Sequence, residues 1–379
     1  MDIYVVQTGD TIDLIAERAG ADVQKIIYDN QLVYPFALAV GQALLIDDNT
    51  AAKDRRSLYV NGFAYPFISG WVLRQTLPYL SAISSFSYGF TPEGELIDPV
   101  LADDFIIEEA LDADVRPILT LTPFGEDGKF NNSLISVVVN DAAVQATLID
   151  NLINKMYEKG FKGVNIDFEY ILKEDRDAFT AFVAATVARM RQEGFDVSVD
   201  LAPKNSSTQQ GLLYEGKDYA ALGRIADHVL VMTYEWGYTY GPPMAVAPIN
   251  QVRKVIEYAV TQIDSDKIDL GIPNYGYDWP LPYERGKTKA KTIGNVEAVR
   301  IAIDNGAQIM FDETAMSPYF TYTDSEGTLH EVWFEDVRSM SAKFNLIKEF
   351  NLRGAGYWQL MQLFRANWVL LNHEFDIIS

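Results

Sequence analysis

The residues with the clearest capacity for chemistry lie in the run 163–170, which reads Gly-Val-Asn-Ile-Asp-Phe-Glu-Tyr. Its polar residues Asn165, Asp167 and Glu169 alternate with apolar ones, so in a β-strand their side chains would share one face. Crowded carboxyl groups raise the pKa of one of them, which keeps that group protonated as a general acid near neutral pH. The run alone leaves two interpretations open: an acid–base site, and a half-exposed strand with a solvated polar face.

The composition excludes several other kinds of chemistry. The 379 residues include no cysteine and only three scattered histidines, so we expect no disulfide, no thiol nucleophile, no metal site and no cofactor. The formal net charge of −22 argues against nucleic acid and anionic membranes as partners. The N-terminus has no basic segment before an apolar stretch, and no run reaches the about 18 apolar residues of a membrane span. We therefore expect a soluble protein without a standard secretory signal, whose oligomeric state the sequence leaves open.

Residues 1–47 have the pattern of a small β-α-α-β module. The expected elements are a strand over Ile3–Val6, helices from Thr11 to Gly20 and from Val23 to about Asn30, and a strand over Ala43–Ile46. The pattern resembles a LysM domain, with matches at Tyr4-Val5-Val6, Thr8-Gly9-Asp10-Thr11 and Gly41-Gln42-Ala43-Leu44. LysM domains bind glycans that contain N-acetylglucosamine, such as peptidoglycan and chitin. A generic α+β cap is the alternative, and the polar residues 48–57 are expected to form a linker.

From residue 58 onwards, short apolar runs alternate with amphipathic stretches, of which 141–159, 174–193 and 249–262 are the clearest. The runs that predict strands are Leu58–Phe63, Ile83–Phe86, Arg116–Leu121, Gly163–Glu169, Asp196–Ala202, His228–Tyr234, Ile268–Tyr275 and Gly354–Trp358. Eight β-then-α repeats predict an α/β fold of the (β/α)8 TIM-barrel type, in which active sites lie at the C-terminal ends of the strands. Glu169 falls at such an end.

One interval after Tyr275 departs from this alternation. It contains a predicted helix over 295–305 and strand-like segments at 308–312, 319–323 and 330–334, the last two joined by a turn. We expect a small α+β insertion over about 277–340, mounted on the top of a barrel that spans 58–379. There it would deepen a groove, although a purely structural excursion remains the alternative.

Four motifs in the right order resemble glycoside hydrolase family 18, the chitinase-like barrel enzymes. The strand-four signature of that family, Asp-x-x-Asp-x-Asp-x-Glu, aligns with Lys162, Asn165, Asp167 and Glu169. The other matches are Met232-Thr233-Tyr234-Glu235 for Met-x-Tyr-Asp, Gly271-Ile272-Pro273-Asn274-Tyr275-Gly276 for Gly-x-Pro-x-Tyr-Gly, and Trp358 for the strand-eight tryptophan. With its LysM pattern, the chain is similar to the spore cortex-lytic N-acetylglucosaminidases, which often carry two LysM repeats where this chain shows one.

The resemblance implies a retaining, substrate-assisted mechanism. Glu169 would protonate the glycosidic oxygen, while Asp167 orients the 2-acetamido group of the substrate so that its carbonyl oxygen attacks C1. Tyr234 would hydrogen-bond that carbonyl and stabilise the oxazolinium intermediate. Lys162 and Asn165 depart from the family signature. Because Asn165 removes a like-charged neighbour of Asp167, we expect a shifted pH profile and retained activity.

Further candidates for substrate binding are Asn165, Met232, Glu235, Tyr275, Trp333 and Trp358. Trp358 offers a flat apolar surface for a sugar ring. Glu235 stands where the family has aspartate, and its longer side chain leaves its role open. Core packing is the commoner role for a residue such as Met232. Tyr275 and Trp333 fit packing between barrel and insertion as well as they fit substrate contact.

The expected function is hydrolysis of β-1,4 bonds after N-acetylglucosamine in peptidoglycan, in particular in spore cortex or its fragments. By resemblance, the expected location is the spore coat or cortex, or the cell wall. A chitinase is the alternative within the enzyme class, since both polymers contain the same acetamido sugar. A non-catalytic, lectin-like glycan-binding barrel is the alternative outside it, which the presence of both Glu169 and Asp167 disfavours.

Overall fold

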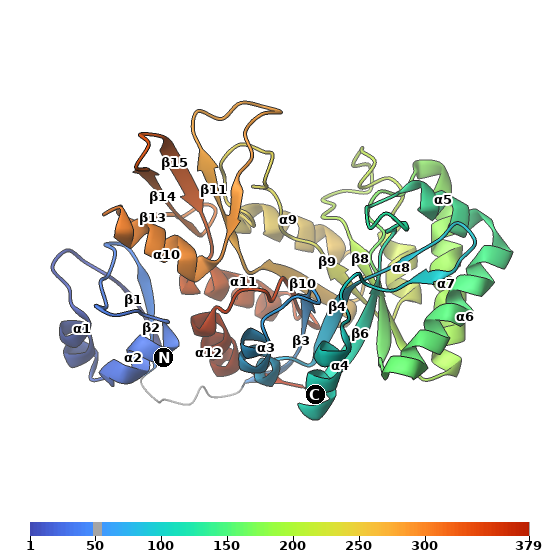
Figure 1. Ribbon diagram of the computed structural model, residues 1–379, viewed down its shortest axis with the longest axis horizontal. Helices are drawn as coiled ribbons and strands as arrows, with labels where there is room; N and C mark the ends of the chain where they lie inside the picture. Colours follow the sequence, from blue (N-terminus) through green and yellow to red (C-terminus); the bar gives the residue numbers. More distant parts are fainter. Residues whose placement is uncertain (48–54, 379) are drawn as a thin grey trace.

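Eight parallel strands form a closed barrel, as the sequence predicts (Figure 1). The computed structural model describes residues 1–47 and 55–378. The barrel strands, in their order around the barrel, are β3 (Arg56–Ala64), β4 (Ala82–Phe90), β6 (Arg116–Leu121), β7 (Gly163–Ile166), β8 (Asp196–Leu201), β9 (His228–Val231), β10 (Ile268–Pro273) and β16 (Gly354–Trp358). Pairing of β3 with both β16 and β4 closes the circle. Two short strands extend the sheet: β5 (Leu96–Ile97) pairs with β4 and β17 (Phe375–Ile377) pairs with β3.

Two of the strands that carry candidate residues end earlier than predicted. β7 ends at Ile166, so Asp167 and Glu169 follow the strand instead of continuing it. β9 ends at Val231, because Thr233 N–H bonds to the Val231 carbonyl at 2.8 Å and Tyr234 N–H bonds to the Met232 carbonyl at 2.9 Å. Such i to i+2 bonds turn the chain out of an extended conformation. The alternation in the sequence therefore continues past the last residue that pairs with a neighbouring strand.

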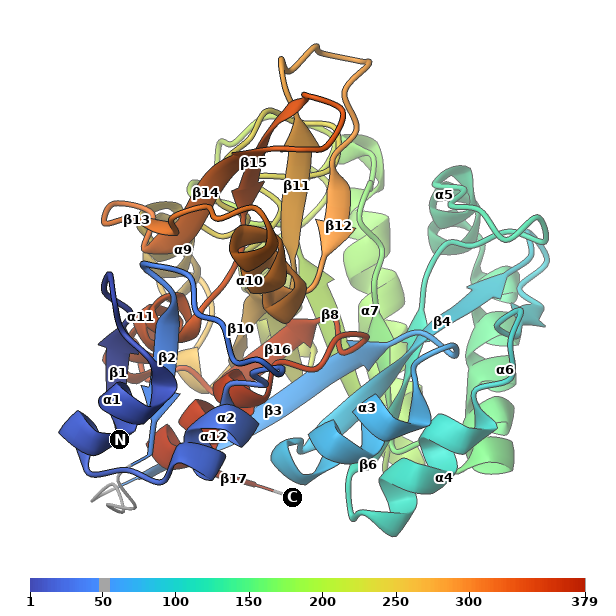
Figure 2. The ribbon, with the colours of Figure 1, turned by 60° about the vertical axis from the view of Figure 1, so that its left-hand side comes forward.

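Helices surround the barrel and cover its apolar outer face (Figures 1 and 2). They are α3 (Gly70–Thr76), α4 (Asp104–Asp112), α5 (Ser133–Asn140), α6 (Ala142–Lys159), α7 (Arg176–Gln192), α8 (Tyr219–Ile225), α9 (Ile249–Ala259), α11 (Val337–Glu349) and α12 (Arg365–Glu374). The three most regular predicted helices correspond to α6, α7 and α9, with ends that differ by up to three residues. Among the described residues, no single helix is long and apolar enough to cross a membrane, although α5 and α6, bent by 102°, reach that length and composition together.

The predicted insertion is a five-stranded antiparallel sheet with one helix. Its strands, in spatial order, are β12 (Lys291–Ile293), β11 (Gly276–Pro280), β15 (Leu329–Trp333), β14 (Ser317–Thr323) and β13 (Met310–Asp312), and its helix is α10 (Asn295–Asp304). The predicted hairpin turn is present, with Asp324 N–H bonded to the Thr328 carbonyl at 2.9 Å. The sequence did not predict β11, which starts three residues after β10, or the three-residue β12. The sheet stands beside the C-terminal ends of the barrel strands (Figure 2).

The N-terminal module has the predicted β-α-α-β order. It consists of β1 (Asp2–Val5), α1 (Ile12–Ala19), α2 (Val23–Asp29) and β2 (Ala43–Ile46), with β1 and β2 antiparallel. Thr11 caps α1 by accepting a hydrogen bond from Leu14 N–H, and Gly20 ends that helix with a left-handed φ of 63°. Apolar residues from all four elements form a separate small core, which includes Ile15, Ile26 and Leu44.

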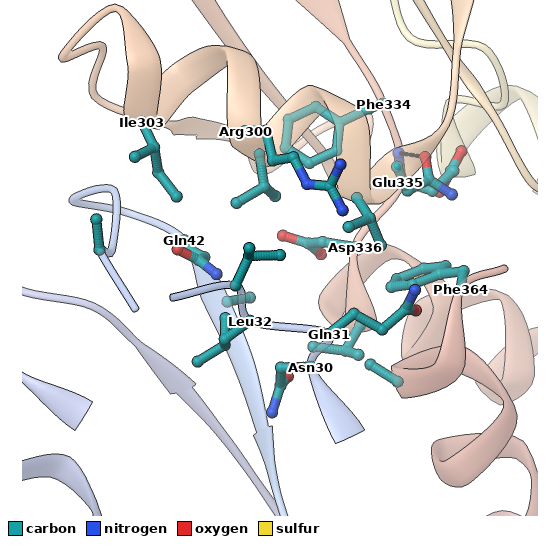
Figure 3. A pocket seen from close by; sticks show the side chains of 18 of the residues that line it. Asn30, Gln31, Leu32, Gln42, Arg300, Ile303, Phe334, Glu335, Asp336 and Phe364 are labelled. Atoms are coloured by element: carbon teal, nitrogen blue, oxygen red, sulfur yellow. Dashed lines mark hydrogen bonds between the residues drawn. The ribbon is translucent and has the colours of Figure 1, made fainter. Parts of the chain in front are cut away.

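This module packs tightly against the rest of the protein. Leu45 belongs to the main core, and Ile309 N–H bonds to the Val40 carbonyl at 2.8 Å. The Arg365 guanidinium lies 3.9 Å from the ring centre of Tyr28. Between the module and α10 there is a cavity of about 320 Å³, where Figure 3 shows Leu32 and Gln42 on one side and Arg300 and Ile303 on the other.

Most of the predicted linker, 48–57, lies outside the described residues. Its last two residues are not linker, however, because Arg56 and Ser57 begin the barrel strand β3 and pair with Phe375 and Asp376 of β17. This pairing extends the barrel sheet beyond the start that the polar sequence suggested.

Candidate active site

A cavity of about 510 Å³ opens at the C-terminal ends of the barrel strands. It is lined by Phe63, Tyr65, Phe86, Phe124, Phe130, Asp167, Glu169, Tyr170, Asp200, Leu213, Met232, Tyr234, Glu235, Tyr238 and Trp358. Six of the nine sequence-predicted site residues line this cavity, and two more are hydrogen-bonded to lining residues, Asn165 to Asp200 and Tyr275 to Glu235. A second hollow of about 500 Å³ shares Tyr65, Phe86 and Phe124 with the first, so the two form neighbouring parts of one surface.

Asp167 and Glu169 line the cavity and come just after β7. Asp167 is 5% exposed, and its Oδ1 atom is buried without any hydrogen-bond partner among the described residues. Burial raises the pKa of Asp167 well above its ordinary value, and the charges of Glu169 and Asp200 raise it further. Burial also raises the pKa of Glu169. Both carboxyl groups are therefore inclined to hold protons at pH values where ordinary carboxyl groups are ionised.

Asp200 is a third buried carboxyl group of the site, and the sequence analysis missed it. It comes from β8, next to β7, and its Oδ1 accepts a 2.8 Å hydrogen bond from Asn165 Nδ2. Burial raises its pKa to about 7, although this hydrogen bond opposes the shift. The alternation of Ser198 and Asp200 with valines, on a strand predicted to neighbour the Asn165 strand, is the signal that could have found it.

Asn165 does not contact Asp167 through its amide donors. Its Nδ2 group donates to Ser198 Oγ at 3.0 Å and to Asp200, which uses both N–H bonds of the amide. Lys162 is exposed and precedes the first residue of β7, so it lies at the opposite end of the strand from the cavity. Of the two departures from the family signature, only Asn165 is therefore close enough to alter the carboxyl groups.

Tyr234 and Met232 reach the cavity from the bend that follows β9. Gly271 makes room for the Tyr234 ring, because a Cβ atom at that position would lie 2.9 Å from the ring carbon Cε1. Burial raises the pKa of Tyr234 well above its ordinary value, so its hydroxyl keeps its proton and can donate it in a hydrogen bond. Met232 packs with the aromatic residues on the cavity floor.

Glu235 is exposed as a residue, but its carboxylate is held by two tyrosines. Its Oε1 accepts hydrogen bonds from the hydroxyl groups of Tyr277, at 2.9 Å, and Tyr275. Tyr275 is 2% exposed and does not line the cavity. Tyr275 therefore lies behind the cavity wall in this structure. Its role in substrate binding stays a prediction.

Trp333 also lies outside the residues that line the cavity. Its ring stacks on Tyr319 with centroids 4.5 Å apart, and its Nε1 donates to Glu331 at 2.7 Å. It forms part of the apolar contact between insertion and barrel. A role for Trp333 in substrate binding likewise stays a prediction.

Trp358 forms the aromatic floor of the cavity together with residues of the first two barrel strands. Its ring contacts Phe86, with centroids 4.9 Å apart, and Tyr65 and Phe63, each at 5.8 Å. Two of these contacts, with Phe86 and Tyr65, are edge-on, the contact with Phe63 is tilted, and Trp358 remains partly exposed to the cavity. A flat, partly packed aromatic surface beside proton-holding carboxyl groups suits a sugar ring whose glycosidic bond is to be protonated.

The comparisons with known proteins agree with this arrangement. A model described as glycosyl hydrolases family 18 matches residues 121–362, and a LysM domain model matches residues 4–47. The cortical fragment-lytic enzyme of Bacillus subtilis (strain 168) is 37% identical over 430 residues, covering 100% of this chain and 99% of that protein.

Solved structures show the same likeness. The spore cortex-lytic enzyme SleL of Bacillus cereus has a TM-score of 0.93 at 32% identity, covering 100% of this chain and 99% of the other. A chitinase from Chromobacterium violaceum, with a TM-score of 0.76 at 24% identity and coverage of 84% and 98%, shares the fold. From its site, its fold and its full-length relatives, the chain belongs to glycosyl hydrolases family 18 and carries an N-terminal LysM domain.

Proposed function

We propose that this glycosidase cleaves the β-1,4 bond that follows N-acetylglucosamine in spore cortex peptidoglycan or in fragments of it. Support for the substrate comes from full-length relatives that are named for lysis of cortex or cortical fragments. Support for the chemistry comes from one observation above the others, the buried and unpartnered Oδ1 atom of Asp167. A buried acceptor without a donor is costly, and the acetamide N–H of a bound sugar would supply that donor.

Glu169 acts as the general acid in this proposal. Its raised pKa keeps the proton that the leaving glycosidic oxygen must receive. As the bond to C1 breaks, the acetamide carbonyl oxygen of the substrate attacks C1 and forms an oxazolinium ion. Asp167 accepts a hydrogen bond from the acetamide N–H, and the Tyr234 hydroxyl donates to the acetamide oxygen. Water, deprotonated by Glu169, then opens the ring on the face that the leaving group occupied, with retention at C1.

Because position 165 carries an amide, Asp167 has no carboxyl neighbour on β7 with which to share a proton. The Asn165 amide instead stabilises the ionised form of Asp200, with which it shares a hydrogen bond. Asp200 in turn raises the pKa of Asp167. In this proposal, the carboxyl group on β8 takes over part of the electrostatic role that the family signature gives to a residue on β7.

The size of the cavity surface favours a polymer over a small glycoside. The two adjoining hollows, of about 510 and 500 Å³, share an aromatic border at Tyr65, Phe86 and Phe124. The LysM domain would hold the same polymer and so raise the concentration of glycan at the barrel. In this proposal the protein acts at the spore cortex or the cell wall.

The experiment that tests the proposal identifies the sugar at the new reducing end. Purified protein is incubated with cortex fragments and, separately, with chitin oligomers, and the products are reduced with borohydride and analysed by mass spectrometry. Glu169→Gln provides the matched control. Reduced N-acetylglucosamine ends from cortex, absent with the variant, are expected. Reduced muramic acid ends would contradict the bond assignment, cleavage of chitin alone would favour a chitinase, and binding without cleavage would indicate a glycan-binding barrel.

A further inference from the structure

We propose that the ammonium group of Lys217 fixes how protons are distributed among Asp167, Glu169 and Asp200, and thereby sets the pH range in which the enzyme works. Lys217 belongs to none of the motifs that define the site, and it does not line the cavity. It is a positioning residue, because it would act through the carboxyl groups without touching the substrate. The inference rests on the proposed roles of Glu169 and Asp167.

Lys217 is a fully buried lysine behind the catalytic carboxyl groups. Its exposed fraction is 0%, and its Nζ donates a 2.6 Å hydrogen bond to the main-chain carbonyl of Asp200. This is the only hydrogen bond of the Nζ group within residues 1–47 and 55–378, although an ammonium has three protons to donate. A buried ammonium requires compensating negative charge, which the carboxyl groups of the site supply.

The main chain around Lys217 is fixed by contacts on both sides. The preceding Gly216 approaches the segment that follows Glu169 so closely that a Cβ atom there would lie 2.3 Å from the Ile171 carbonyl oxygen. The following Asp218 caps α8 by accepting from Ala221 N–H at 3.0 Å. Lys204 Nζ donates to the Lys217 carbonyl at 3.2 Å. Lys217 is thus held at one place relative to the catalytic segment.

Three ionisable groups act on the Lys217 ammonium, and they are the three carboxyl groups of the site. Burial lowers the pKa of Lys217, and the negative charges of Asp167 and Glu169, after β7, and of Asp200, on β8, oppose that shift. The charge of Lys217 lowers the pKa of each of them, against the opposing effect of burial. One ammonium cannot neutralise three carboxylates. We therefore expect some of these three carboxyl groups to stay protonated while at least one is ionised.

Removal of the positive charge would raise the pKa values of all three carboxyl groups together. The general acid would then keep its proton to higher pH, and the carboxylate that must be ionised would stay protonated to higher pH. Both limbs of the pH dependence of kcat/KM should therefore move upwards by about one pH unit or more. At the acidic limb, this corresponds to a loss of about tenfold in kcat/KM at a fixed pH.

The test compares three variants of the full chain on cortex fragments between pH 4 and pH 9. Lys217→Met removes the charge and the hydrogen bond, Lys217→Gln removes the charge but keeps a donor, and Lys217→Arg keeps the charge. We expect the optimum to move upwards with methionine and glutamine and to stay near that of the parent with arginine. Urea unfolding of the same proteins gives a second readout, since the uncharged variants should lose stability more steeply from pH 5 to pH 8.

Two results would overturn the inference. One is a loss of kcat/KM with Lys217→Met and Lys217→Gln that is equal at every pH, which would indicate a structural role. The other is a parent-like profile with Lys217→Gln, which would assign the effect to the hydrogen bond. Failure of the proposed function would be recognised separately, because Glu169→Gln would then be as active as the parent protein.

Discussion

Acidic side chains are buried at both ends of the barrel, and the two ends differ in how many hydrogen-bond and ion-pair partners surround the carboxyl groups. At the N-terminal end, Asp269 on β10 is 2% exposed and accepts hydrogen bonds from Arg353 Nη1, at 2.8 and 2.9 Å, and from His228 Nδ1, at 2.8 Å. The Arg353 guanidinium in turn lies 3.7 Å from the ring centre of Tyr59. These partners lower the pKa of Asp269 although burial alone would raise it.

At the C-terminal end, the effect of burial on the carboxyl pKa values exceeds the effect of hydrogen bonds and positive charges. Asp167, Glu169 and Asp200 all have raised pKa values, and among the described residues Asp167 has an Oδ1 atom with no partner. Burial is therefore common to both ends and does not distinguish them. The difference lies in the hydrogen-bond donors, which are complete around Asp269 and incomplete around Asp167, where the acetamide N–H of the proposed substrate would supply one.

The largest effect is expected from Asp167→Asn, which alters the incompletely paired end. Loss of the carboxylate should reduce kcat by about 10²- to 10³-fold, because an amide cannot stabilise the charge that develops on the acetamide group. The free energy of unfolding at pH 7 should stay level or rise, since a buried ionisable group is removed. Initial rates on cortex fragments and urea unfolding check both parts. A fall in stability that accounts for the lost rate would contradict the comparison.

Asp269→Asn should show the opposite pattern. It leaves Arg353 without its carboxylate partner, so we expect the free energy of unfolding to fall by about 3 kcal/mol at pH 7, with kcat of the folded protein unchanged. Because the folded-state pKa of Asp269 is lowered, its contribution is present above the ordinary value of 3.8 and is lost as the pH falls below it. The difference in stability from the parent should thus shrink in acid. A difference that is constant from pH 7 to pH 2.5 would be evidence against a paired carboxylate.

Asp200→Asn should change stability with the reverse dependence on pH. The folded-state pKa of about 7 exceeds the ordinary 3.8, so the folded protein binds a proton that the unfolded chain releases as the pH rises through this window. Asp200 therefore costs stability at pH 8 and none at pH 3. The variant should be more stable than the parent by roughly 4 kcal/mol at pH 8 and equal to it at pH 3. Thermal unfolding at the two pH values checks this. A variant that is less stable than the parent at pH 8 would indicate that Asp200 is paired like Asp269.

The smallest effect is expected from Arg365→Ala at the contact with the LysM domain. Arg365 lies over the Tyr28 ring and donates to the Tyr28 carbonyl at 3.1 Å, but it is partly exposed. Its loss should lower the free energy of unfolding by about 1 kcal/mol and leave kcat on soluble fragments unchanged. Hydrogen exchange of α2 would report the loosened contact. The result measures the contribution of a cation that has no carboxylate partner in the described part of the chain, for comparison with Arg353, which pairs with Asp269 at the N-terminal end.

The helices and strands of the fold could be predicted well, because the spacing of apolar residues follows directly from secondary structure. All eight barrel strands, the LysM elements and the helix of the insertion follow from patterns within one segment. The ends of β7 and β9 were less predictable, since the alternation around Asp167 and the bend at Tyr234 depend on pairing with neighbouring strands. The tight contact of the LysM domain was not predicted, because the Ile309–Val40 hydrogen bond joins main-chain atoms far apart in sequence.

The same reasoning explains which parts of the site could be found. Asp167 and Glu169 share a short run whose spacing signals their proximity. Asp200, on β8, and Lys217, in the loop before α8, come close to these residues only when the barrel has formed. A single buried lysine produces no recognisable pattern in a sequence. The three-dimensional charge balance of the site is therefore visible only in the structure.

The most direct measurement of the central claim is the rate at which Glu169→Gln releases reducing ends from cortex fragments, with urea unfolding followed on the same sample. We expect a loss of at least about 10²-fold in kcat, with the free energy of unfolding unchanged or increased. A rate within about threefold of the parent would contradict the account, because the proton that breaks the glycosidic bond would then come from another group.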